Sequence, residues 1–139
     1  MGQQQLLLLV LGIVIVGLAV VVGIQAFGEN QKKANSDALV NDVVRIASDA
    51  QAWNLKPTAF GGGNGAFTGL DFADLGYAAT SGVYSNLNGR FDLAVNSATQ
   101  ITIRGCDSQT GFNNLITAVV NGTGPANIAT TVASTACPF

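Results

Sequence analysis

Few side chains in this sequence could carry chemistry. Histidine is absent, which removes the commonest general base and the commonest metal ligand. Asp71 and Asp74 form the only close pair of carboxylates outside a long helical pattern, and no histidine or reactive-looking cysteine accompanies them. A calcium ion typically takes about 6–8 oxygen ligands, far more than this pair supplies. We therefore expect a loop or helix-start role for both aspartates, no catalytic residue, no metal, no cofactor and no enzyme activity.

The two cysteines predict a structural disulfide. Cys106 and Cys137 lie in the polar half of the chain, and their spacing matches no Cys-x-x-Cys redox or metal motif. Disulfides persist outside the cytoplasm, so this pairing implies that the polar half is exported. We expect the bond to join a strand of a sheet to the C-terminal tail.

Two further patterns concern modification and charge. Asn121-Gly122-Thr123 matches an N-glycosylation acceptor, which makes Asn121 a possible glycosylation site, although the tripeptide is common by chance and Asn121-Gly122 is also explained as a helix stop. The six basic residues are scattered, and the net charge is -2. Nothing in this pattern predicts a nucleic-acid surface.

The elements that must carry these residues begin with an apolar segment. Residues 6–24 are uninterrupted apolar residues and glycines, and a bilayer core needs about 20 apolar residues of helix. The segment is too long, and its start too uncharged, for a secretory signal. Lys32 and Lys33 would place the following part of a single-span protein in the cytoplasm, whereas the cysteine pair implies export. The conflict disappears if a basic leader preceded Met1 and was removed.

An amphipathic pattern continues the apolar helix to Trp53. Leu39, Val43, Ile46, Ala47, Ala50 and Trp53 recur at three- and four-residue steps and form one apolar stripe. No proline occurs before Pro57, so nothing forces a break in the helix. The sequence thus predicts an N-terminal helix over about residues 1–53 with an apolar half and an amphipathic half.

The remaining residues, 54–139, predict a small globular domain. Residues 54–65 contain a run of glycines and read as a linker. We expect a short helix over residues 68–76, strands over 90–95 and 100–104 joined at 96–99, and a last strand over 128–135. Residues 112–119 have helical spacing, although their β-branched content leaves a strand possible. The predicted class is α+β, with the long helix packed on a small antiparallel sheet.

Taken together, these features resemble a mature type IV pilin. The uncharged start, the apolar and amphipathic half-helices, the glycine-rich loop, the few strands and the late cysteine pair all fit this family, and Met1 and the Cys106–Cys137 region are most similar to its type IVb branch. The resemblance implies a ladle-shaped fold and a subunit of an extracellular pilus that functions in adhesion, motility or a similar surface role. It also implies residence in the inner membrane before assembly, processing by a prepilin peptidase, N-methylation, and handling by the pilus assembly machinery.

The resemblance further implies that copies of the chain polymerise through their first helices. The residues expected at this homopolymer contact share one helical region and are Met1, Gln5, Leu6, Leu9, Ile13, Val16, Val20 and Ile24.

The sequence departs from the family at two of its usual positions. Gln5 stands where members usually have a glutamate that pairs with the terminal amine of a neighbouring subunit, so we expect neutral hydrogen bonds from glutamines to take its place. Val22 stands at about the position of a proline that is associated with local melting of the helix, and Gly17 and Gly23 could substitute for it.

Two alternatives remain open from the sequence. The chain could be a single-span, membrane-anchored extracytoplasmic binding protein, or a minor pilin or pseudopilin of a secretion system. The presence or absence of the chain in sheared extracellular filaments discriminates between an anchored protein and a filament subunit.

Overall fold

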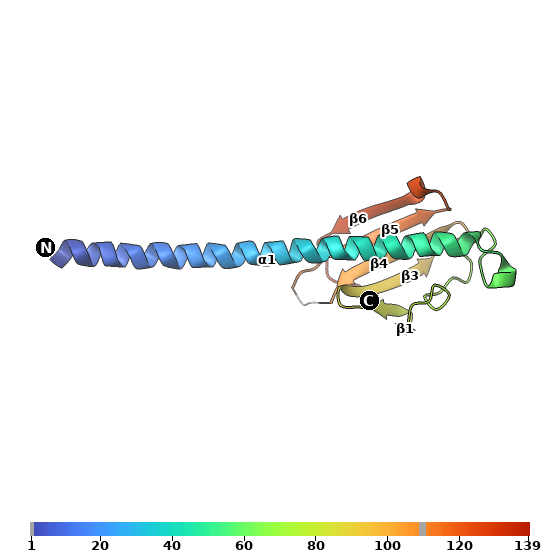
Figure 1. Cartoon of the computed structure of the whole chain (residues 1–139), viewed down its shortest axis with the longest axis horizontal. Helices are drawn as coiled ribbons and strands as arrows, with labels where there is room; N and C mark the ends of the chain where they lie inside the picture. Colours follow the sequence, from blue (N-terminus) through green and yellow to red (C-terminus); the bar gives the residue numbers. More distant parts are fainter. Residues whose placement is uncertain (1, 109–110) are drawn as a thin grey trace. The chain divides into compact units, whose positions relative to one another are not determined.

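The computed structural model describes residues 2–108 and 111–139, which form one long helix and one antiparallel sheet (Figure 1). This confirms the predicted α+β class with a long N-terminal helix. The chain divides into two compact units, residues 1–34 and residues 35–139. The described part of the first unit, residues 2–34, is helical throughout. The second unit contains the rest of the helix, the sheet and the connecting loops.

Helix α1 spans Gly2–Leu55 and ends two residues beyond the predicted Trp53. Pro57 disfavours helical geometry at the residue before it, which stops the helix here. The glycine-rich loop then supplies donors to the last carbonyls of the helix, since the Trp53 oxygen accepts from Gly63 N at 3.0 Å and the Asn54 oxygen from Gly65 N at 2.7 Å. A Cβ atom at Gly63 would lie 2.5 Å from the Trp53 ring. The loop therefore caps the helix only with glycine at this position.

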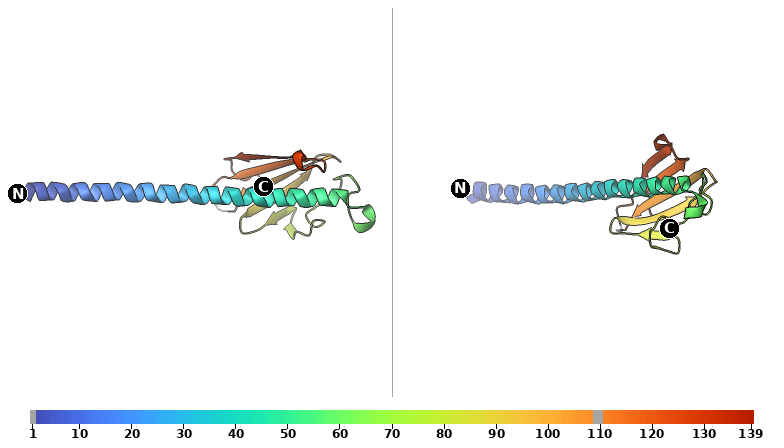
Figure 2. Two further views of the ribbon diagram at one scale, coloured as in Figure 1. Left: turned by 45° about the horizontal axis from the view of Figure 1, so that its top comes forward. Right: turned by 45° about the vertical axis from the view of Figure 1, so that its right-hand side comes forward.

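The sheet is a meander of six antiparallel strands paired in chain order. The strands are β1 (Ala79–Thr80), β2 (Val83–Ser85), β3 (Gly89–Val95), β4 (Gln100–Asp107), β5 (Leu115–Asn121) and β6 (Ile128–Ala133). Short 3-10 turns cover Thr58–Phe60 and Pro125–Asn127. Within the second unit, residues 35–55 of α1 lie along one face of this sheet (Figure 2).

The core of the second unit lies between this part of α1 and the sheet. Side chains alternate across each strand, so Ile116, Ala118 and Val120 of β5 face α1 while their neighbours face away. Gly105 of β4 lets the helix approach closely, because a Cβ atom there would lie 2.7 Å from Val43 Cγ2. The predicted helical stripe is buried on this side at Leu39, Val43, Ile46, Ala47 and Ala50, with Trp53 partly buried.

Two predicted helices are wrong. Residues 68–76 form turns with no helix, because backbone and carboxylate hydrogen bonds around Asp71 and Asp74 hold the segment in tight turns. Residues 115–121 are strand β5, because β-branched residues pair with strands on both sides and every second side chain enters the core. The strand alternative for this stretch is the correct one. The predicted strands over 90–95, 100–104 and 128–135 are confirmed as β3, β4 and β6.

Candidate functional sites

The largest apolar surface belongs to residues 6–24 of α1. Every large apolar side chain of this segment is between 51% and 70% exposed. Soluble proteins rarely expose apolar patches above a few hundred square ångströms, so a continuous surface of this kind marks a contact with lipid or with protein. By length and composition, α1 is a helix that could cross a membrane.

The assembly residues expected from the sequence lie on this segment and are all exposed. Leu6, Leu9, Ile13, Val16, Val20 and Ile24 follow at three- and four-residue steps, which places them on one side of the helix. Leu7, Leu8 and Leu11 point elsewhere and are exposed to a similar degree. Exposure therefore does not single out one stripe, and the segment offers an apolar surface in every direction. Gln5 lies on the same helix and is exposed, while Met1 lies outside the described residues.

The predicted disulfide is present and closes the C-terminal tail onto the sheet. Cys106, fully buried in β4, is bonded to Cys137 of the tail, and their Cα atoms are 5.5 Å apart. The bond encloses β5 and β6, so the region contains two strands and not the predicted helix and strand.

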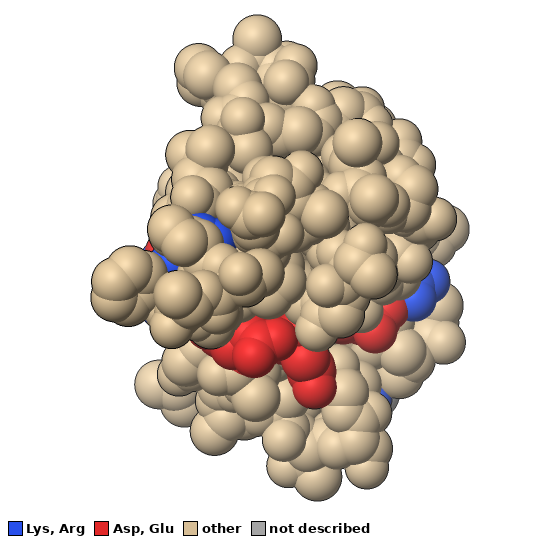
Figure 3. All heavy atoms as spheres, turned by 90° about the vertical axis from the view of Figure 1, so that its right-hand side faces the viewer, with Lys and Arg blue, Asp and Glu red and all other residues tan. Residues whose placement is uncertain are grey.

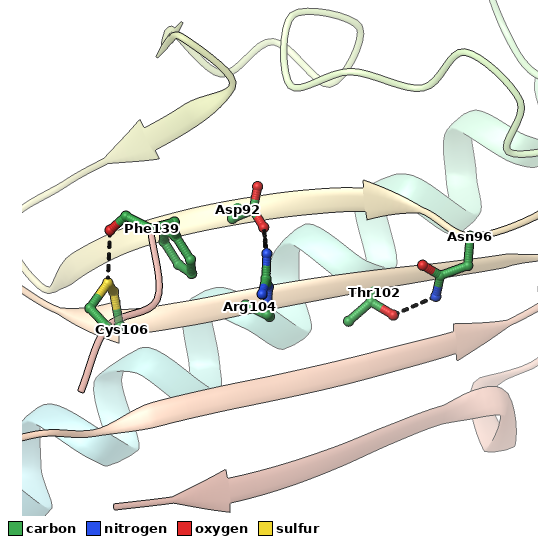
Figure 4. Close-up of polar contacts among 7 residues, drawn as sticks. Asp92, Asn96, Thr102, Arg104, Cys106 and Phe139 are labelled. Atoms are coloured by element: carbon green, nitrogen blue, oxygen red, sulfur yellow. Dashed lines mark hydrogen bonds and ion pairs between the residues drawn. A yellow bond between two sulfur atoms is a disulfide. The ribbon is translucent and has the colours of Figure 1, made fainter. Parts of the chain in front are cut away.

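The end of the tail packs on the face of the sheet that is turned away from α1 (Figure 4). The Phe139 ring lies 5.3 Å from the Arg104 guanidinium carbon and 5.9 Å from that of Arg90. Arg104 is held in turn by an ion pair with Asp92 across the two strands. Cation–π contacts of this kind contribute about 0.5–1 kcal/mol at exposed sites. The tail is thus fixed at its end as well as by the disulfide.

An amide network holds the turn between β2 and β3. Asp42 Oδ2 accepts from Asn86 Nδ2 at 3.0 Å and from Asn88 Nδ2 at 2.7 Å. Asn86 Oδ1 accepts from the backbone of Asn88 and Gly89, and Asn35 donates to the Asn88 carbonyl at 2.9 Å. The turn is therefore held against α1 near Asn35 and Asp42. Leu87 is at its tip and is 99% exposed.

A cavity opens beside the C-terminal end of α1. Its volume is about 260 Å³, and Asp49, Ala52, Trp53, Lys56, Asp74 and Leu75 line it. Figure 3 looks at this end of the second unit and shows acidic side chains gathered in a band across it. The indole nitrogen of Trp53 is buried and makes no hydrogen bond within the described residues. Reasoning from the sequence placed Trp53 in the apolar stripe but missed the cavity, since Leu75 was assigned to a helix that does not form.

Tyr77 links the loop before β1 to the helix. Its hydroxyl donates to Asp49 Oδ2 at 2.5 Å, and its ring lies 4.9 Å from that of Tyr84 and 6.3 Å from that of Phe72. Burial, and then the hydrogen bond and charge of Asp49, raise the pKa of Tyr77 to about 12. All of these effects favour the neutral phenol, whose hydroxyl proton is donated to the Asp49 carboxylate.

The Tyr77→Phe variant is expected to lose about 1.5 kcal/mol of unfolding free energy, the lower end for a hydrogen bond to a charged group. Because the pKa of Tyr77 is raised from 10.0 to about 12 on folding, this contribution is complete below pH 10 and is lost as the pH rises toward 12. Urea unfolding followed by the fluorescence of the single tryptophan measures it. The gap between wild type and variant should close across that window, and a gap that stays constant through it would contradict the prediction.

The remaining sequence candidates have local roles. The Asp74 carboxylate accepts from Asp71 N at 3.1 Å, and the Asp71 carboxylate accepts from Phe72 N at 2.7 Å, so both carboxylates serve turns in an exposed loop. Within residues 2–108 and 111–139, no group of three or more His, Cys, Asp or Glu side chains could hold a metal ion. Asn121 ends β5, is exposed, and accepts from Gln100 Nε2 at 2.6 Å. Its glycosylation stays a prediction.

Comparison with known proteins adds no further constraint. No protein-family model, no curated protein and no solved structure matches this chain. Its function therefore has to follow from the residues and surfaces described above.

Proposed function

We propose that this chain is a structural subunit that polymerises through its N-terminal helix into an extracellular type IV pilus filament. The observation that carries this proposal is the apolar surface of residues 6–24, which is exposed on every side of the helix. Such a helix has to be enclosed by lipid or by other helices.

Outside a membrane, copies of the same chain can enclose this segment. Burial of a Leu, Ile or Val side chain stabilises by about 1.5–3 kcal/mol, and residues 6–24 carry fifteen such side chains. Identical chains that repeat one heterologous contact without closing a ring form a helical filament. In water, this arrangement encloses the apolar segment of each copy except those at the filament ends. Before assembly, the bilayer of the inner membrane provides the same enclosure.

The second unit supports an extracellular location for the polar half. Its Cys106–Cys137 bond is stable outside the reducing cytoplasm. Its sheet covers the apolar stripe of residues 39–50, so this stripe is buried without any partner chain. The proposal includes the ladle-shaped pilin architecture, the removal of a leader by a prepilin peptidase, and delivery of the subunit to the pilus by its assembly machinery. It requires no cofactor.

A single-span anchored protein is the second candidate, favoured by the length and composition of α1. It would keep residues 6–24 in lipid permanently, with residues 35–139 as an extracytoplasmic binding domain. A minor pilin or pseudopilin would use the same helix in a shorter polymer. The three possibilities differ in where the chain is found and in what form.

Electron microscopy of material sheared from the cell surface tests the proposal. We expect regular fibres whose main component, by intact mass, is this chain, because the apolar segments remain enclosed after the fibres leave the membrane. The same cells should hold a second pool that only detergent extracts from the inner membrane. Recovery of the chain only in the detergent extract, with no fibres in the sheared material, would favour the anchored protein.

A further inference from the structure

We propose that β6 pairs edge to edge with β6 of a second copy of this chain, in antiparallel orientation and about a two-fold axis at Thr130. The second unit alone makes this contact, so it does not depend on the proposed function. The packing of residues 6–24 plays no part in it.

The backbone of β6 has one unpaired side, because β6 is a border strand of the sheet and lies beyond α1 in Figure 1. Its outward-facing residues follow from the ladder between β4 and β5, in which Asp107 N donates to the Asn114 oxygen at 3.3 Å. Backbone direction alternates along antiparallel strands, so the odd-numbered residues of β5 turn their backbone groups toward β6 and meet its odd-numbered residues. The backbone N–H and C=O groups of the even-numbered residues of β6 therefore point away from the sheet. These residues are Ile128, Thr130 and Val132.

The strand β6 lacks the features by which proteins usually protect an open edge, namely charges, prolines, bulges or a covering element. Its six residues include no charge and no proline, and its register with β5 runs without a bulge. Residues 129–133 are all exposed, and Val132 is 60% exposed. Within the described residues, no backbone group of a turn or loop bonds to the outward side of β6. An edge of this kind is a template for a further strand.

A second copy of β6 fits this edge in one antiparallel register. With Thr130 opposite its counterpart, Ile128 lies opposite Val132, and every outward N–H and C=O group of both strands gains a partner. The side chains of these residues lie on the face of the sheet that is turned toward α1, since they pair with the inward-facing residues of β5. The Val132 side chain of one copy is therefore covered by Ile128 of the other. Cross-strand apolar pairs of this kind stabilise a sheet.

The absence of charge favours a copy of the same chain as the partner. No Asp, Glu, Lys or Arg occurs after Asp107, so β5, β6 and the turn between them carry no charged side chain. A two-fold contact brings residues close to their own counterparts, where like charges would repel each other. A charged peptide would find no complementary side chain on this edge, whereas a second β6 needs none.

The helices leave room for this contact and define its direction. The strand residues buried under α1 come from β3, β4 and β5, and only Ile128 of β6 packs partly against them. A two-fold axis perpendicular to the sheet makes residues 35–55 of α1 run in opposite directions in the two copies. Copies within one helical array point the same way, so the partner belongs to an array of opposite direction.

For the filaments of the proposed function, this contact joins neighbouring filaments that run in opposite directions. Repetition along both filaments would add many weak contacts, so a modest affinity per pair is enough. Only this role between filaments rests on the proposed function, whereas pairing of two single chains does not.

Replacement of Thr130 tests the contact in the full chain held in detergent. Thr130→Pro removes the N–H at the two-fold axis, and Thr130→Lys places the ammonium groups of the two copies opposite each other. Each should weaken dimerisation about 10- to 100-fold in analytical ultracentrifugation, whereas Thr130→Val should leave it nearly unchanged. Because the Thr130 N–H points away from β5, neither change removes a hydrogen bond of the sheet, and urea unfolding should stay close to wild type.

Crosslinking of single cysteines measures the direction of pairing. Cys106 and Cys137 are bonded to each other, so an added cysteine is the only free thiol of the described residues. With a short bismaleimide, Thr130→Cys should give covalent dimers, because this side chain lies opposite its own counterpart. Ala133→Cys is the matched control and should give none, since it is exposed on the same strand but lies about 20 Å from its counterpart at about 3.4 Å per residue.

The outcomes separate this contact from the proposed function. Dimers from Ala133→Cys but not from Thr130→Cys, attachment of Thr130→Cys only to a different protein, or unchanged dimerisation of Thr130→Lys would each overturn the contact, whether or not fibres form. The expected dimers from a chain that never forms fibres would support the contact and overturn the proposed function. Wild-type fibres that lie side by side in electron micrographs, with Thr130→Lys fibres that stay single, would support the contact between filaments.

Discussion

Leu11→Lys is expected to abolish fibre formation, and Val16→Lys should do the same. Both residues are more than half exposed in the single chain, so neither change disturbs its fold. In a filament of packed helices, the ammonium group would be buried without a partner, and the cost of such burial is several kcal/mol even after relaxation. Each added subunit carries this penalty, and about 4 kcal/mol per subunit weakens the assembly equilibrium about a thousand-fold. Electron microscopy of the sheared fraction measures the effect.

The matched control is Leu11→Met, which keeps the volume and apolar character of the side chain and should give normal fibres. Membrane insertion provides a second control. One lysine at the centre of a membrane helix costs only about 2.5–3.5 kcal/mol on insertion scales, so the charged variants should still reach the membrane fraction. Normal fibres from both charged variants would show that residues 6–24 are not buried among copies of themselves.

Removal of the disulfide is expected to lower the unfolding free energy of the second unit by about 3–4 kcal/mol. Cys106 and Cys137 are 31 residues apart, and in the chain-entropy model a closed loop of this length contributes an amount of this size. The double variant Cys106→Ala, Cys137→Ala avoids a buried hydroxyl at the fully buried Cys106. Urea unfolding of wild type and variant measures the difference. Since many small domains have only about 5–15 kcal/mol of stability, this loss is large.

Phe139→Ala in the disulfide-bonded chain separates the bond from the packing of the tail. It removes the ring from Arg90 and Arg104 and should lower the unfolding free energy by only about 0.5–1 kcal/mol.

Intact mass after alkylation, with and without reductant, checks the Cys106–Cys137 bond itself. Two alkylatable thiols in the native wild-type chain would refute the pairing.

The first strand of the Cys106–Cys137 region, β5, shows where reasoning from sequence failed. In residues 112–119, apolar side chains at i, i+3, i+4 and i+7 satisfy a helical period, yet Ile116, Ala118 and Val120 satisfy the strand period equally well. Local spacing cannot separate these patterns in a short β-branched run. Pairing with β4 and β6 decides in favour of the strand, and those partners are distant in the sequence.

The helix predicted over residues 68–76 was wrong for a related reason. The capped helical pattern of residues 68–76 is weak, and the Phe72 and Leu75 side chains instead pack with the core from irregular turns. Tertiary burial of a large aromatic side chain is worth more than the propensity of a single helical turn.

By itself, the sequence determined the parts of this protein that depend on local pattern. Residue types and spacing predicted the long N-terminal helix, which has no proline and spans 54 residues in the structure. They also predicted its segment that is apolar on all sides, the one-sided apolar stripe that follows, and the pairing of the only two cysteines. Only the tertiary structure decided the surfaces that join distant residues. The Leu87 turn depends on Asp42 and Asn35, and the cavity beside Trp53 depends on Leu75 and Asp74. These contacts arise from how the chain packs across long sequence separations, and no local period encodes them.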